Sequence, residues 1–148
     1  MTMGKTDGHD VLNRLLRGEL AATETYQQAL AKVGNEPRAA DLRRIHDEHR
    51  AAANELRQHI HGHGGKPDQG SGSWGAWAKT VEGSAKIFGD AAAVKALKEG
   101  EEHGVKDYED ALNDAGLSAD CKDLIRNRLL PQTRSHLPAL DRFIDARA

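Results

Sequence analysis

The chain has 148 residues, 38% of them hydrophobic and 30% charged, and 21 Lys and Arg against 23 Asp and Glu leave a formal charge of −2. This balance lacks the basic excess of a nucleic-acid binder, and no apolar run approaches the roughly 18 residues of a membrane span. Because the N-terminus also lacks the apolar core of a signal peptide, we expect a cytoplasmic protein that binds neither nucleic acid nor membrane.

The core must be built mainly from aliphatic side chains. Two Trp, two Tyr and two Phe cannot fill the interior of a chain of this size. Small apolar residues within long charged segments are typical of packed helices, and no segment alternates like a strand. We therefore expect a single all-α domain over residues 1–148, either a monomer or a homodimer.

Two helices are predicted in the first part of the chain. Apolar residues recur at helical spacing from residue 8 to residue 33, and Gly34 ends this segment. Pro37 suits the first turn of a second helix that runs to about residue 61. Since only a few residues separate the two segments, they predict an antiparallel hairpin over residues 8–61.

A second hairpin is predicted after a long connection. The connection covers residues 62–89, and Trp74 and Trp77 lie on the apolar face of a short helix expected within it. Two further amphipathic segments, separated at Gly116, predict a hairpin over residues 90–146. Two hairpins joined by a long crossover favour a four-helix bundle.

The two hairpins also resemble each other in sequence. RGELAATETYQQAL, which begins at Arg17, and EGEEHGVKDYEDAL, which begins at Glu99, share Gly, Glu, Tyr, Ala and Leu in one register without a gap. Such a coincidence indicates a duplicated helical hairpin with pseudo-twofold symmetry.

Each long helix carries one Glu or His within its apolar stripe. Glu19, His49, Glu101 and His136 stand near the middle of the first, second, third and fourth helix, so folding should bring them to a common level. Buried carboxylates are costly unless protons, cations or a metal balance them. Two carboxylates and two imidazoles suit Fe, Mn or Zn, and we expect a divalent metal centre.

Tyrosines accompany both glutamates. Tyr26 and Tyr108 follow Glu19 and Glu101 by two helical turns on the same face, where a hydroxyl can reach a carboxylate of the opposite hairpin. The alternative interpretation is metal-free: the same Glu and His side chains form a hydrogen-bonded network that fixes the packing. The chain would then be an interaction or stress-associated protein.

These residues resemble a known superfamily. Glu-x6-Tyr on the odd-numbered helices, a mid-helix His on the even-numbered ones and the long crossover resemble ferritins and rubrerythrins. RGELAATETY, EGEEHGVKDYEDAL and HGHGGKPDQGSGSWGAW are similar to an uncharacterised bacterial family of ferritin-like four-helix-bundle proteins. The resemblance implies a ferritin-like bundle with ligands Glu19, His49, Glu101 and His136, and a redox, metal-handling or oxidative-stress role by analogy.

The chain departs from the superfamily pattern three residues before each histidine. Bridging glutamates are expected there, but this chain has His46 and Thr133. A dinuclear centre draws on about four carboxylates, so a mononuclear or incomplete site is favoured. His46 and Gln132 are candidate substitute ligands around the site, whereas Glu48 is expected to face solvent.

Two further groups of residues attract attention. His59, His61 and His63 alternate at the end of the second helix, where they either hold a transition metal or form a solvated helix end. Cys121 lies in the first turn of the fourth helix, where the helix N-terminus is expected to lower its pKa. No catalytic base is recognisable near it, and a single cysteine forms no thiolate cluster.

Overall fold

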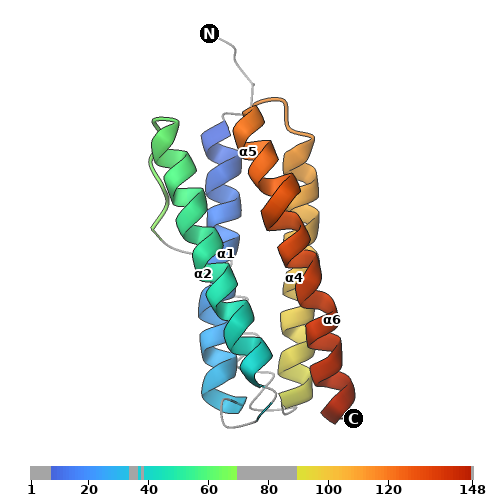
Figure 1. The fold of residues 1–148 in the computed structure, drawn as a ribbon. Helices are drawn as coiled ribbons and strands as arrows, with labels where there is room; N and C mark the ends of the chain where they lie inside the picture. Colours follow the sequence, from blue (N-terminus) through green and yellow to red (C-terminus); the bar gives the residue numbers. More distant parts are fainter. Residues whose placement is uncertain (1–7, 34–36, 38, 70–89, 148) are drawn as a thin grey trace.

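The computed structural model describes residues 8–33, 37, 39–69 and 90–147 (Figure 1). These residues form helices, turns and irregular segments, with no strand among them, as the composition predicts. The elements in chain order are α1 (Gly8–Val33), α2 (Ala39–Gly62), α4 (Asp90–Leu112), α5 (Ala119–Leu124), the π-helical turn η2 (Ile125–Leu129) and α6 (Leu130–Arg147). Trp74, Trp77 and the helix predicted around them lie outside the described residues.

The four long helices lie side by side (Figure 1). α1 and α2 run antiparallel and pack along each other, and so do α4 and α6. α1 also packs against α4, and α2 against α6, while α2 and α4 run in the same direction. The middles of all four helices therefore face a common interior. Among the described helices, none is both long and apolar enough to cross a membrane.

Two apolar clusters fill this interior. One contains Leu12, Leu56 and Ile125, and the other contains Ile45 and Phe143. Burying each such side chain contributes about 1.5–3 kcal/mol relative to leaving it exposed. On each long helix, the buried Glu or His lies in sequence between the residues of the two clusters. The polar residues thus occupy a layer with apolar packing at both ends.

The end of α2 is shaped by glycine. The Gly65 N–H donates to the Ile60 carbonyl at 2.8 Å, and the His63 N–H donates to the His59 carbonyl at 3.1 Å. Gly64 between them has φ +80°, a left-handed conformation that favours glycine. His63 is consequently held one turn beyond His59.

The π-helical turn before Pro131 changes which residues of α6 face inward. Pro131 lacks an N–H, and its ring would clash with the carbonyl four residues earlier in a regular α-helix. The wider turn buries both Leu129 and Leu130, and one turn later Thr133 is buried at 4% exposure. The prediction that Gln132 lies on the core stripe is wrong, since Gln132 is only half-buried.

Candidate metal centre

His49 connects three helices at the centre of the protein. Its Nδ1 lies 3.0 Å from Oε2 of Glu19 on α1, and its Nε2 lies 2.7 Å from Oε2 of Glu101 on α4. All three side chains are buried. The two glutamates therefore contact opposite nitrogens of one imidazole.

His136 brings α6 into the same cluster. Its Nδ1 lies 3.0 Å from Oε1 of Glu101, and its Nε2 lies 2.8 Å from Oε1 of Glu48 on α2. The rings of His49 and His136 meet edge to face, with centroids 4.8 Å apart. The two carboxylate oxygens of Glu101 thus contact different histidines: Oε2 contacts His49 and Oε1 contacts His136.

The expectation that Glu48 faces solvent is wrong. Its side chain is 26% exposed, and its carboxylate points to His136 on the neighbouring helix. Helical periodicity places the Glu48 backbone about 100° away from His49, but a glutamate side chain has enough rotatable bonds to bend toward a neighbour. The nearby imidazole of His136 gives it a hydrogen-bond partner.

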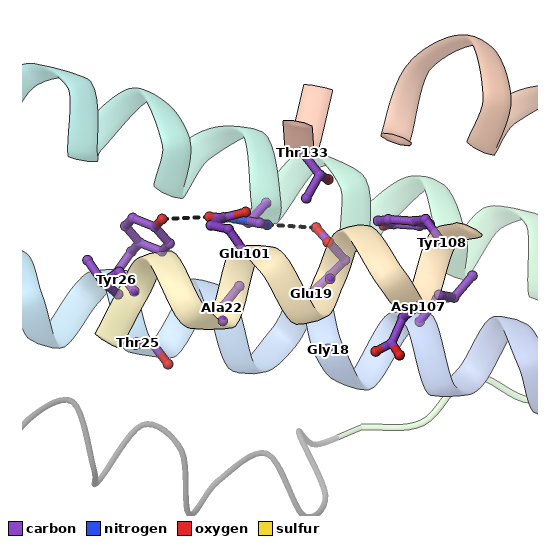
Figure 2. A pocket seen from close by; sticks show the side chains of 14 residues that line it. Gly18, Glu19, Ala22, Thr25, Tyr26, Glu101, Asp107, Tyr108 and Thr133 are labelled. Atoms are coloured by element: carbon purple, nitrogen blue, oxygen red, sulfur yellow. Dashed lines mark hydrogen bonds and ion pairs between the residues drawn. The ribbon is translucent and has the colours of Figure 1, made fainter. Parts of the chain in front are cut away.

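The two tyrosines flank the two central carboxylates. Figure 2 shows Tyr26, Glu101, Glu19 and Tyr108 in a row, with Tyr26 pointing to Glu101. The Tyr26 hydroxyl donates to Oε2 of Glu101 at 2.5 Å, across the two hairpins, as the spacing predicts. The buried Tyr108 hydroxyl lies near Glu19 but makes no hydrogen bond of acceptable geometry within the described part of the chain. The two tyrosines, which occupy matching positions of the sequence repeat, therefore differ in their hydrogen bonding.

Charge pairing outweighs burial in the central cluster. Burial by itself would raise the pKa of Glu101, but the charge of His49 and hydrogen bonds from both histidines hold that pKa well below its ordinary value. Burial likewise disfavours the charged form of His49, yet Glu101 and Glu19 raise its pKa well above the ordinary value. Without a metal, Glu101 and His49 therefore form an ion pair.

The tyrosines keep their protons. Burial, followed by the charge of Glu101, raises the pKa of Tyr26, and burial, followed by the charge of Glu19, raises that of Tyr108. Two neutral hydroxyls thus lie beside two carboxylates.

Three of the four expected ligands come close enough together for one ion. Donor atoms of His49, Glu101 and His136 all lie within 4.8 Å of one another. Glu19 lies outside this group because it contacts the Nδ1 side of His49, away from Glu101.

The two candidate substitute ligands differ in their surroundings. His46 is buried and lies outside the group of three; its Nδ1 lies 3.0 Å from Oδ1 of Asp47, and its Nε2 has no hydrogen-bond partner among the described residues. Gln132 is half-buried, four residues before His136. His46 therefore does not replace a missing glutamate in this arrangement.

A small cavity of about 40 Å³ adjoins the cluster between α1 and α4. Small residues of the two helices line it, among them Gly18, Ala22, Gly100 and Gly104 (Figure 2). A water molecule needs roughly 10–15 Å³ by this measure, so the cavity accepts small molecules only. The Tyr26 and Tyr108 side chains also line it.

Cys121 has the opposite character to the one expected. Its side chain is buried at the start of α5, and burial raises the pKa of its thiol. The prediction of a lowered pKa is therefore wrong, because burial and the charge of Asp120 outweigh the hydrogen bond with Ser118.

Comparison with known proteins gives a family but no activity. Residues 3–114 match a domain family described as a domain of unknown function, DUF2383. No curated protein matches the chain, and no solved structure matches it. The matched residues include Glu19, His49 and Glu101, whereas His136 lies beyond them. As the match covers most of its length, the chain belongs to the DUF2383 domain family.

Proposed function

We propose that this protein binds one divalent metal ion through His49, Glu101 and His136, within a ferritin-like four-helix bundle. The observation that carries the proposal is the presence of three buried donors, two imidazoles and a carboxylate, within 4.8 Å of one another. Fe, Mn and Zn bind such donors readily, and two histidines with one carboxylate form the ligand set of many non-haem iron sites.

The outer carboxylates support this ligand set. Each histidine turns one nitrogen to Glu101 and the other to a second glutamate, which is Glu19 for His49 and Glu48 for His136. Carboxylates that accept the far N–H of a metal-binding histidine fix its tautomer and orientation. Glu19 therefore acts as a positioning residue, and the inner atoms are Nε2 of His49 and Nδ1 of His136.

Charge balance also fits a divalent ion. Glu19, Glu48 and Glu101 bring three carboxylates to two imidazoles. A divalent ion adds the same charge as protonation of both rings, so it can replace two protons without changing the net charge. The cluster is thus compatible with a metal despite its burial.

The chemistry available at the site depends on which ion binds and on which molecules can reach it. Bound iron or manganese would supply redox chemistry, consistent with metal handling or a response to oxidative stress. The chain's own residues orient Glu101 through the Tyr26 hydroxyl and limit entry to molecules that fit a cavity of about 40 Å³.

A second candidate function is a metal-free structural network in an interaction or stress-associated protein. The observation in its favour is that all four ring nitrogens of His49 and His136 already have carboxylate partners. A buried polar network in which each group has a partner fixes the packing of a core without any metal. The two functions differ in metal content and in their response to chelators.

The test is metal content combined with diffraction. Protein purified without an affinity tag should hold about one ion at the centre, and anomalous scattering at the Fe, Mn and Zn edges should place it roughly 2.0–2.2 Å from Nε2 of His49. Glu101→Gln should abolish this peak, while Glu102→Gln, at the exposed neighbouring position, should not. An empty centre in metal-replete wild-type crystals would establish the structural network instead.

Glu19→Gln separates a ligand from a positioning residue. If Glu19 orients His49, the variant should bind the central ion about 10–100-fold more weakly but still bind it. Complete loss, as in Glu101→Gln, would make Glu19 a direct ligand.

A further inference from the structure

Four potential metal ligands meet at the end of the protein where α2 finishes and α5 begins. They are His59, His63, Asp120 and Cys121, and one donor atom from each lies within 4.8 Å of the others. Two come from the first hairpin and two from the second. None of them belongs to the central cluster.

The local backbone fixes these side chains in place. His59 and His63 are four residues apart, and the hydrogen bond between the His63 N–H and the His59 carbonyl keeps them on one face. Asp120 and Cys121 occupy the first turn of α5, after Ser118. His61 alternates with the two histidines in the sequence but is not part of the group.

The distances suit a tetrahedral ion. Zinc bonds of about 2.0 Å to nitrogen or oxygen and 2.3 Å to sulfur require ligand atoms roughly 3.3–3.5 Å apart. The His59 Nδ1 lies 3.5 Å from the Cys121 Sγ and 3.6 Å from the Asp120 Oδ2, and the His63 Nε2 lies 3.0 Å from the same oxygen. Two of these three distances are close to the values that zinc requires, and the remaining pairs of donor atoms lie within 4.8 Å of each other.

We propose that His59, His63, Asp120 and Cys121 form a second metal site, selective for Zn²⁺. Zinc would displace the thiol proton and take one bond from each residue, which completes its four-coordinate shell. A closed shell of this kind is structural, and it would tie the end of α2 to the start of α5. A cavity of about 130 Å³ beside His63 and Cys121 gives the ion a route in.

This proposal is independent of the proposed function at the centre. The central donors are nitrogen and oxygen only, whereas the end site includes the Cys121 thiol, which would bind an ion as the thiolate. Co²⁺ takes zinc's place in such sites, and thiolate coordination gives an intense near-ultraviolet charge-transfer band that nitrogen and oxygen ligands lack. Cobalt spectra therefore report on the end site even if the central site binds nothing.

The experiment titrates Co²⁺, then Zn²⁺, into reduced, metal-depleted protein. Wild type and Glu101→Gln should both show the charge-transfer band, with an intensity that corresponds to one thiolate-bound Co²⁺ per chain, and Zn²⁺ should remove it. Cys121→Ser should lose the band. His63→Ala should bind Co²⁺ more weakly by over roughly 100-fold. Such a loss exceeds the roughly 10–100-fold that removal of a residue outside the metal's own ligands costs. His61→Ala, the matched control in the same tract, should behave as wild type.

Two results would overturn the proposal. One is the absence of a thiolate band in wild type. The other is equal weakening by His61→Ala and His63→Ala, which would mean that the ion binds loosely along the histidine tract. His63 is exposed, so its variant should fold and give an answer even if Cys121→Ser does not.

Discussion

The central cluster and the cluster at the end of α2 both contain two histidines, yet burial makes them different in kind. At the centre, His49 and Glu101 are almost inaccessible to solvent, and every imidazole nitrogen has a carboxylate partner. At the end, the side chains of His63 and Asp120 are exposed by 36% and 59%, so solvent reaches both of them. An unpaired charge is therefore expensive at the centre and inexpensive at the end.

The largest effect should come from removing the residue that both central histidines contact. Glu101→Ala should destabilise the metal-depleted protein by about 3–5 kcal/mol, because it leaves one nitrogen of each buried imidazole without its carboxylate partner. Chemical denaturation followed by circular dichroism measures this loss. Glu102→Ala, at an exposed position one residue later, is the control and should change little. Equal losses of unfolding free energy in the two variants would show that the contacts of Glu101 with the histidines do not stabilise the protein.

The pH dependence of stability should reveal the same pairing. The lowered pKa of Glu101 contributes stability that is present above its ordinary value of 4.5 and is lost as the pH falls through the folded-state pKa. The raised pKa of His49 contributes stability that is present below 6.5 and is lost as the pH rises through the folded-state pKa. Metal-depleted protein should therefore be most stable between these two values.

Thermal melts across pH test this prediction, with and without saturating Mn²⁺. A metal requires neutral imidazole, so bound Mn²⁺ should remove the loss of stability on the alkaline side. Mn²⁺ prefers oxygen and nitrogen ligands, which directs it to the centre rather than to the thiolate. If the melting temperature of the metal-depleted protein did not fall as the pH rises, the ion pair between His49 and Glu101 would be contradicted.

The two tyrosines offer a matched pair within the central cluster. Tyr26→Phe removes a hydrogen bond to a buried carboxylate and should cost about 1.5–3 kcal/mol, whereas Tyr108→Phe removes a hydroxyl without a good partner and should be close to neutral. Equilibrium unfolding of both variants gives the difference. Similar costs would show that the Tyr108 hydroxyl bonds to Glu19 after all.

A glycine beside the cavity tests whether open space matters at the centre. A Cβ at Gly104 would meet Cγ2 of Thr133 at 3.6 Å, an ordinary contact. Gly104→Ala should therefore stabilise the protein by about 0.5–1 kcal/mol through helix propensity. If the cavity admits small molecules to the metal, the same variant should slow the reaction of the bound ion with added peroxide, observed spectroscopically. Destabilisation would show that the helices at Gly104 cannot accept a methyl group.

The smallest effect is expected at the end cluster. Without metal, His63→Ala should alter stability by no more than about 0.5 kcal/mol, because solvent compensates for the lost contacts. Zn²⁺ should then raise the melting temperature of wild type by more than that of His63→Ala, since a ligand stabilises only the state that binds it. A large loss without metal would mean that this cluster is a structural ion pair.

Much of the central site is predictable because helical periodicity decides which face a residue occupies. Glu19, His49, Glu101 and His136 interrupt apolar stripes at corresponding levels, and the structure brings all four into contact through His49 and Glu101. The Tyr26 contact follows from the same spacing. The bounds of α1 and α2 also agree with the glycine and proline signals to within two residues.

Other features depend on how the helices meet. Glu48 joins the cluster because its flexible side chain bends toward α6, and Thr133 replaces Gln132 on the core face because a π-helical turn precedes Pro131. His59 and Cys121 become neighbours because two hairpin ends coincide. The amino-acid pattern fixes the faces of individual helices, since periodicity is local, whereas rotamers and contacts between helices depend on packing that no single segment encodes.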